Sequence, residues 1–218
     1  MELAASLPIW DKLTPAQQQA VEQSAQRRTL APGTVLQREG GECMGLLLLE
    51  SGQLRAYLLN DEGREITLYR LFDRDLCLFS ASCMLHSIQF DITIEAEKET
   101  DLWIIPTPVA RAVMEESAPT ANFLNEIMAS RFSEVMWLVE QVLWKSFDRR
   151  LAAFLLEESR LEGSDTLTIT HEAIGRHLGT AREVVTRMLR YFQSEGWVEL
   201  TRGKVRISDR KGLQRLEN

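Results

Sequence analysis

Short hydrophobic runs alternate with turn-forming residues between Leu30 and Pro106. Runs of this kind, with apolar residues at every second position, are typical of antiparallel β-strands that bury one face. Their spacing predicts about eight strands, enough for a sandwich or jelly roll. The turn signals between them are Pro32-Gly33, Gly40-Gly41, Ser51-Gly52 and Asn60-Asp61-Glu62-Gly63.

The clearest hairpin is the stretch GQLRAYLLNDEGREITLYRL, residues 52–71. Its two halves are rich in β-branched, aromatic and leucine residues, and the Asp and Gly between them tolerate the positive φ of a tight turn. A further strand signal is FDITIEAEKETDLWIIP, residues 90–106, which alternates apolar and polar positions before a turn at residues 98–101. Both stretches therefore support an antiparallel sheet.

The hydrophobic period changes after Pro106, and residues 119–147 contain no glycine and no internal proline. This predicts one long helix. It carries two adjacent apolar stripes, so we expect one stripe to pack on the β domain and the other on the same helix of a second chain. Burial of the helix within one monomer is equally compatible with the pattern. The stripes are Leu124, Met128, Val135, Leu138 and Val142, and Phe132, Met136, Val139 and Leu143.

A second helix, DRRLAAFLLEESRLEG, is predicted to end at Gly163, and the sequence THEAIGRHLGTAREVVTRMLRYFQSEGWVEL follows a short β-like segment. Thr170 is a suitable helix N-cap, and Gly179 suits a tight turn between two amphipathic helices. Beyond Gly196, a hairpin turning at residues 202–204 would form a basic wing. Helix, turn, helix and wing together predict a winged helix-turn-helix.

The second of these helices places Arg182, Glu183, Thr186, Arg187 and Arg190 on one exposed face. Arginine can bond the O6 and N7 of guanine together, and a carboxylate in the major groove can accept from the N4 amino group of cytosine. Since a carboxylate repels phosphates, its presence favours base reading over simple charge attraction. The alternative is a solvated face with a weak Glu183–Arg187 ion pair.

Charge supports that assignment, because the chain has a formal net charge of −7 but residues 145–218 carry 14 Lys and Arg against 11 Asp and Glu. The remaining residues carry 11 against 21. A local basic face can bind phosphates even in an acidic protein. There is no apolar run long enough to span a membrane, so we expect a cytoplasmic protein without a membrane partner.

The order of β-roll, long helix and winged helix-turn-helix resembles the CRP/FNR family of transcription regulators over nearly the whole chain. The matching motifs are Pro32-Gly33, Ser51-Gly52, Gly63, residues 148–152 and the helix-turn-helix. The resemblance implies an α+β fold, with a jelly-roll-like β-roll similar to a cyclic-nucleotide-binding domain (1–117), a dimerisation helix (118–147) and a winged helix-turn-helix (148–218).

The resemblance also implies a homodimer that binds double-stranded DNA at an inverted repeat and regulates transcription. Arg182, Glu183 and Arg187 match the residues that read TGTGA-like half-sites in the receptor-protein branch, and Thr170 and Arg202 match contacts to the DNA backbone. RNA polymerase is a further candidate partner.

The sequence departs from the cyclic-nucleotide-binding members, which carry a Gly-Glu pair for the ribose and an Arg-Ser pair for the cyclic phosphate. This chain has RDLCLFSASCMLHS in that region. A phosphate without an arginine partner would be poorly held, so we expect a small-molecule or redox effector other than cyclic AMP. We expect it in an apolar pocket lined by some of Leu78, Phe79, Cys83, Val135 and Met136.

No cofactor is predicted, although haem ligation by Cys77, Cys83 or His86, or a redox-active Cys83, is an alternative. The simpler interpretation is that both cysteines are small buried residues. His171 and His177 are six residues apart, which excludes an i,i+4 metal pair, and we expect them to contact only solvent or backbone. A jelly-roll enzyme is the contrasting class, but clustered histidines and catalytic motifs such as GxSxG or HExxH are missing, so we predict no enzyme.

Overall fold

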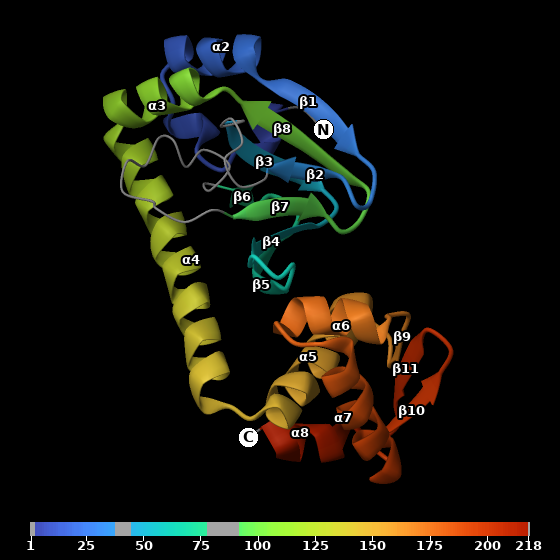
Figure 1. The fold of residues 1–218 in the computed structure, drawn as a ribbon. Coiled ribbons are helices and arrows are strands. Elements are labelled where there is room, and N and C mark those ends of the chain that lie inside the picture. Colours follow the sequence, from blue (N-terminus) through green and yellow to red (C-terminus); the bar gives the residue numbers. More distant parts are fainter. Residues whose placement is uncertain (1–2, 38–44, 78–91, 218) are drawn as a thin grey trace. The chain divides into compact units, whose positions relative to one another are not determined.

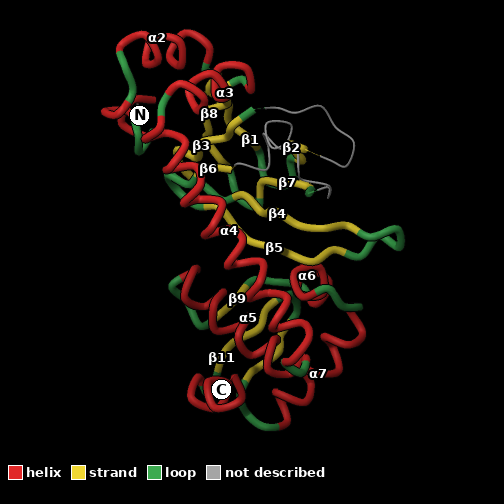
Figure 2. The backbone as a smooth tube through the Cα atoms, turned by 90° about the vertical axis from the view of Figure 1, so that its left-hand side faces the viewer, coloured by secondary structure: helices red, strands yellow, loops and turns green. Residues whose placement is uncertain are grey.

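The computed structural model describes residues 3–37, 45–77 and 92–217 (Figure 1). The chain divides into two compact units, residues 1–58 with 68–135 and residues 59–67 with 136–218. Figure 2 shows that most of the strands lie in the first unit, beside several helices, and that the second unit is mainly helical. This arrangement confirms the predicted α+β fold.

The first unit contains two four-stranded sheets with strand orders β1-β8-β3-β6 and β2-β7-β4-β5. Neighbouring strands such as β3 and β8 are antiparallel, which confirms the predicted roll. The strands are β1 (Gln26–Leu30), β2 (Val35–Gln37), β3 (Leu46–Ser51), β4 (Leu54–Leu59), β5 (Glu65–Leu71), β6 (Leu76–Cys77), β7 (Thr93–Ala96) and β8 (Thr100–Ile105).

The four leucines of β3 divide between two hydrophobic cores. Leu46 and Leu48 belong to a cluster formed with the surrounding helices, whereas Leu47 and Leu49 belong to the cluster between the sheets. Successive side chains of a strand point to opposite faces, so an unbroken apolar run is required where both faces are covered.

The predicted hairpin is formed by β4 and β5. Asn60 Oδ1 accepts hydrogen bonds from the backbone N–H groups of Glu62 and Arg64 at 3.1 and 2.8 Å. Gly63 has a φ of +76°, a conformation in which glycine avoids the steric cost of a Cβ atom. Gly63 thus adopts the positive φ that was predicted for it, whereas Asp61 is not among the described residues with a positive φ, and the side chain of Asn60 closes the turn instead.

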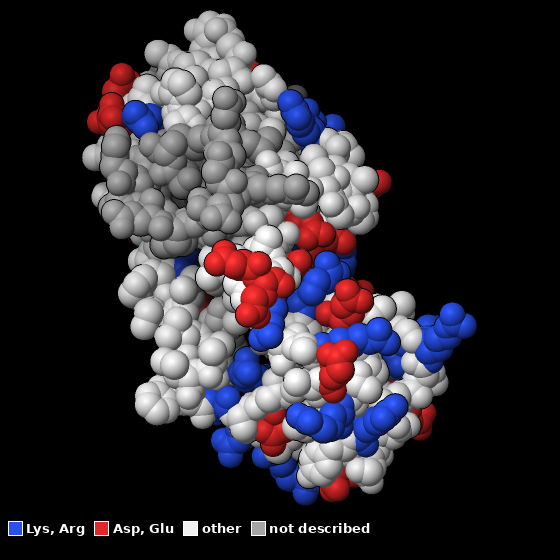
Figure 3. All heavy atoms as spheres, viewed as in Figure 1, with Lys and Arg blue, Asp and Glu red and all other residues white. Residues whose placement is uncertain are grey.

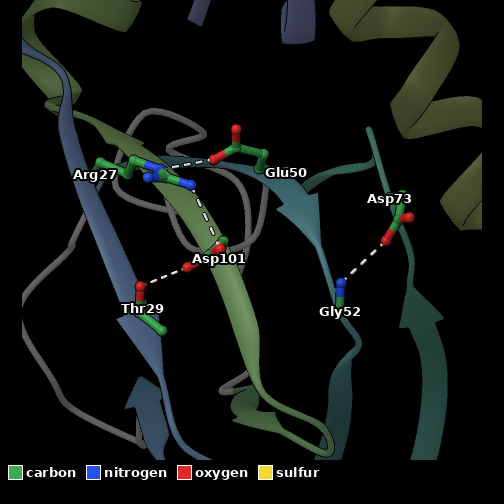
Figure 4. A network of polar contacts seen from close by, with 6 residues as sticks. All are labelled: Arg27, Thr29, Glu50, Gly52, Asp73 and Asp101. Carbon is green, nitrogen blue, oxygen red and sulfur yellow. Dashed lines mark hydrogen bonds and ion pairs between the residues drawn. The ribbon is translucent and has the colours of Figure 1, made fainter. Parts of the chain in front are cut away.

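A polar network lies across β1, β8 and β3 (Figure 4). Arg27 Nε donates to Glu50 Oε2 at 2.7 Å, and Arg27 also pairs with Asp101. Beside it, the backbone N–H of Gly52 donates to Asp73 Oδ1 at 3.0 Å. A Cβ at Gly52 would lie 2.4 Å from the carbonyl oxygen of Glu99, so this turn requires glycine.

Helices pack against the roll, and no element was predicted for the first 29 residues, where three of these helices form. Thr14 and Gln17 form a capping box at the start of α2, with Pro15 in the first turn. The elements are α1 (Leu3–Ser6), the 3-10 helix η1 (Trp10–Lys12), α2 (Pro15–Ser24), α3 (Thr107–Glu116) and α4 (Ala118–Trp144).

The long helix is confirmed as α4, but it ends at Trp144 rather than at residue 147. Ser146 is extended, with φ −63° and ψ 158°, and is the N-cap of the next helix. The predicted end was wrong because the hydrophobic pattern continues through this break, and only backbone conformation marks it.

Arg131 attaches α4 to the roll. Its guanidinium pairs with Glu134 at 2.8 Å and Asp75 at 3.5 Å, and it lies 5.0 Å from the centre of the Tyr69 ring. Burial lowers the pKa of Arg131, but the two carboxylates outweigh burial and raise it. Arg131 lies between Met128 and Val135 of the first apolar stripe. Two ion pairs and the face of an aromatic ring thus hold this charged residue against the roll.

The second unit contains a helical group and a three-stranded sheet with the order β10-β11-β9. Gly163 ends α5 in the left-handed conformation, as predicted. Together these elements confirm the winged helix-turn-helix. They are α5 (Phe147–Glu162), β9 (Thr166–Leu167), α6 (His171–Leu178), α7 (Arg182–Ser194), β10 (Val198–Thr201), β11 (Lys204–Ile207) and α8 (Arg210–Glu217).

Candidate nucleic-acid interface

Three residues determine where α6 begins and how the chain turns from α6 into α7. Thr170 caps α6 by accepting a hydrogen bond from the N–H of Ala173 at 3.1 Å, and Gly179 ends the helix with a φ of +68°. Gly175 is buried, and a Cβ there would lie 2.7 Å from the carbonyl oxygen of Thr180. The small residue allows the backbone after the turn to approach α6 closely.

The buried face of α7 fixes which residues face outward. Val185, Leu189 and Phe192 are fully buried in the core of this unit. Helical geometry then directs the intervening positions to solvent. The exposed residues are Arg182, Glu183, Arg187 and Arg190, and Thr186 is half-buried.

Within the described residues, Glu183 and Arg187 form no ion pair, either with each other or with another side chain. The alternative of a Glu183–Arg187 pair on a solvated face is therefore absent from this structure. Both groups keep their hydrogen-bonding capacity for an external ligand. Without the ion pair between them, the helix loses only a few tenths of a kcal/mol of stability.

The wing is the hairpin of β10 and β11, which turns at Gly203 with a φ of +72°. Arg202 and Lys204 on either side of the glycine are exposed. Arg206, further along β11, pairs with Glu199 across the hairpin instead. Figure 3 shows Lys and Arg side chains over this unit with Asp and Glu among them, so the basic groups are discrete rather than one continuous field.

His171 contacts a side chain, contrary to the expectation of solvent or backbone contacts alone. Its Nδ1 lies 2.9 Å from Thr186 Oγ1, which joins the first residue of α6 to the middle of α7. Burial lowers the pKa of His171, and the positive charges of Arg182 and Arg190 lower it further. The hydrophobic pattern does not reveal this pair because the two residues are 15 apart and meet only when the helices pack. The same expectation was wrong for His177, whose Nδ1 lies 2.9 Å from Thr67 Oγ1 and whose ring centre lies 5.3 Å from that of Phe154.

The structure separates two residues of the predicted effector pocket. Val135 packs against the core between the sheets, whereas Met136 is 47% exposed on the second apolar stripe of α4. The other predicted pocket residues, Leu78, Phe79 and Cys83, lie outside the described residues, as does His86.

Cys77 lies in the core between the sheets and is 1% exposed. Burial, with a smaller contribution from the neighbouring Cys77 thiol, raises the pKa of Tyr69 well above its ordinary value. Tyr69, Cys77 and Arg131 therefore form a buried group beside α4, which the hydrophobic pattern did not predict.

An apolar cavity lies elsewhere, between the N-terminal helices, α3 and the start of α4, and Leu13, Leu46, Val113 and Leu124 contribute to its lining. In the described part of the chain, no three His, Cys, Asp or Glu residues form a group that could hold a metal ion. None of the described helices is both long and apolar enough to cross a membrane.

Two family models match the chain. Residues 27–117 match the cyclic nucleotide-binding domain, and residues 149–216 match the Crp-like helix-turn-helix domain. The two matches follow the same order as the roll and the winged helix.

Similar proteins agree with these matches. A protein of Eubacterium rectale ATCC 33656 assigned to the CRP/FNR transcriptional regulators is 56% identical, with a TM-score of 0.95 over 98% of this chain and 99% of that one. The cyclic AMP receptor protein of Thermus thermophilus is 24% identical over 96% of each chain. The transcriptional regulator SdrP of the same organism is 28% identical over 56% of this chain and 60% of its own length. The winged helix-turn-helix, the roll and these similarities show that the chain belongs to the CRP/FNR family of DNA-binding transcription regulators.

Proposed function

We propose that this chain works as a homodimer that reads an inverted repeat of TGTGA-like half-sites and responds to an effector other than cyclic AMP. The observation that carries the proposal is the exposed face of α7, where Glu183 and Arg187 have no partner among the described side chains. Each is a group that can bond base edges in the major groove.

Arg182 and Arg187 each present a planar guanidinium suited to the O6 and N7 of guanine, and Glu183 is suited to the amino group of cytosine. A TGTGA-like half-site offers both bases, because guanine on one strand places cytosine on the other. Thr170 and Arg202 would contact the sugar-phosphate backbone, which fixes register without reading sequence. Thr186 lies on the same helix and would also contact the bases.

The apolar stripe of α4 supports the homodimer. Phe132 and Leu143 are 67% and 65% exposed in the single chain, and Met136 and Val139 lie between them on the same face. Spacings of four, three and four residues are those of a coiled-coil seam. A second copy of the helix would cover this stripe with an identical one.

Two-fold symmetry then relates the two copies of α7. They would enter successive major grooves with half-site centres about 10 base pairs apart. We assign residues 1–117 to sensing, 118–147 to dimerisation and 148–218 to DNA binding.

The effector would bind between the roll and α4 and would favour one arrangement of the recognition helices, which is a population shift. The candidate residues remain Leu78, Phe79, Cys83, Val135 and Met136. Of the two that the structure describes, Val135 packs on the roll core and Met136 is exposed. A small molecule or a redox change is the expected signal, and RNA polymerase is a candidate partner of the DNA-bound dimer.

Fluorescence anisotropy tests the proposal. The purified protein is titrated against a duplex with inverted TGTGA half-sites and against a scrambled duplex, at two salt concentrations. Preference for the repeat, with affinity that falls steeply as salt rises, is the expected result. Equal affinity for both duplexes would contradict TGTGA recognition, and a random-sequence selection would then show whether another half-site is preferred.

A further inference from the structure

His171 and Thr186 take part in a chain of hydrogen bonds that ends on the backbone. Thr186 Oγ1 lies 2.9 Å from His171 Nδ1 and also donates to the carbonyl oxygen of Arg182 at 2.9 Å. A threonine hydroxyl has only one proton. If that proton is used toward Arg182, the proton toward His171 must be on the ring.

The proton count fixes the tautomer of the neutral ring. With the proton on Nδ1, His171 donates to Thr186 and Thr186 donates to the carbonyl oxygen, so both contacts are satisfied. With Nδ1 unprotonated, the two acceptors would compete for the single hydroxyl proton. The neutral ring therefore carries its proton on Nδ1 and has a lone pair on Nε2.

The surroundings of the ring favour its neutral form in the free protein. Arg182 and Arg190 of α7 act on it, and no carboxylate is among the groups that shift its pKa, which burial and the two arginines lower. Arg182, Thr186 and Arg190 follow one another at intervals of four residues, so they lie along one side of the helix. His171 thus lies beside the exposed arginines of α7.

We propose that His171 is a DNA-contacting residue that binds a proton from solvent when α7 meets DNA. Nδ1–H stays on Thr186, and the newly protonated Nε2 donates a hydrogen bond to a phosphate oxygen. The inference rests on the proposed DNA-binding function. It adds one specific contact and a dependence of affinity on pH.

The physical reason is a reversal of the local field. In the free protein, two guanidinium groups oppose a third positive charge on the ring. A phosphate placed against the same surface offsets their charge and favours the imidazolium. The protonated ring has two donors, one for Thr186 and one for the phosphate, so no internal hydrogen bond is lost.

The dependence on pH has a definite sign. Since the complex holds one more proton than the free protein, affinity rises as pH falls between the pKa of the complex and that of the free ring. The limiting slope is a tenfold gain in affinity per pH unit. Outside that pH window, the contribution of His171 to the affinity for DNA does not change with pH.

The test compares His171→Gln with the intact sequence by anisotropy on the preferred duplex from pH 5.5 to 8.5, at constant ionic strength. Glutamine retains hydrogen-bonding groups but does not titrate in this range. The matched control is His177→Gln, which removes a histidine from the same helix. We expect the slope to fall in the first variant and to persist in the control.

Equal slopes for the intact protein and His171→Gln would overturn the proposal. If the intact protein binds no duplex in preference to a scrambled one at any pH, the failure belongs to the proposed function instead. Should His171→Gln not fold, the ring signals of His171 are followed by NMR in the intact protein with and without duplex. A pKa that does not rise on adding DNA would reject the inference.

Discussion

Arg150 of α5 donates a hydrogen bond from Nη1 to the backbone carbonyl oxygen of Leu178, the last residue of α6, at 3.1 Å. Its guanidinium also lies 5.6 Å from the centre of the Phe147 ring. Burial lowers the pKa of Arg150. The side chain therefore links α5 to the end of α6, the helix that precedes the turn, and satisfies a carbonyl left unpaired at a helix terminus.

Arg150→Met should lower the free energy of unfolding by about 1 kcal/mol, because methionine keeps much of the apolar stem but leaves the Leu178 carbonyl without its donor. Urea unfolding followed by circular dichroism measures the change. Arg160→Met is the matched control. Among the described side chains Arg160 pairs only with Glu157, on the surface, so its loss should change stability little. Equal effects of the two variants would reject the structural role of Arg150.

Arg187→Ala should cost about 1–3 kcal/mol of binding free energy on the preferred half-site and relax the choice of base at one guanine. The reason is the loss of a bidentate contact to a base edge. Anisotropy with duplexes changed one base pair at a time gives the measurement. Arg202→Ala should instead weaken binding to every sequence and reduce the salt slope by about one. Uniform weakening by Arg187→Ala would make Arg187 a phosphate contact.

Thr186 has used its only hydroxyl proton inside the protein, so it cannot donate to a base. Its methyl group remains available for the C5 methyl of thymine. Replacing the thymine nearest Thr186 by uracil should therefore weaken binding by the intact protein, whereas Thr186→Ser should bind both duplexes alike. Anisotropy on each thymine-to-uracil duplex measures this, and sensitivity of Thr186→Ser equal to that of the intact protein would contradict it.

Leu143→Glu should convert the proposed dimer to a monomer, because it places two carboxylates at one level of an apolar seam. Sedimentation velocity measures the change, and affinity for a full inverted repeat should fall toward that for a single half-site. Ser133→Glu is the control, because Ser133 is exposed beside Phe132 but outside the apolar stripe. A dimer that survives Leu143→Glu would show that this stripe is not the interface.

Lowering the pH should reduce the free energy of unfolding, because His171 is protonated more readily in the unfolded chain. Its pKa is lowered in the folded chain, so the unfolded chain binds more protons once the pH falls below the ordinary histidine value of about 6.5. The stabilising contribution is present above that pH and decreases as the pH falls toward the folded pKa. Denaturant unfolding at a series of pH values should show a smaller acid loss for His171→Gln than for the intact chain. The same loss in both would exclude His171 as its source.

The sequence by itself determined the elements whose signals are local. The Asn and Gly of the β4–β5 turn, Thr170 at the N-cap of α6, and Gly179 after it each act through their own backbone or through neighbours a few residues away. The exposed face of α7 followed from the helical period, because Val185 and Leu189 mark the buried side. Such features need no knowledge of distant partners.

Only the tertiary structure decided which distant groups meet. The pairing of His171 with Thr186, and of Arg131 with Asp75 and Tyr69, joins residues that are far apart in the sequence. Met136 and Val135 are adjacent in sequence, yet only Val135 packs on the roll core. A hydrophobic pattern records that a face is apolar, but the packing of helices and strands decides what covers it and which charged groups share a surface.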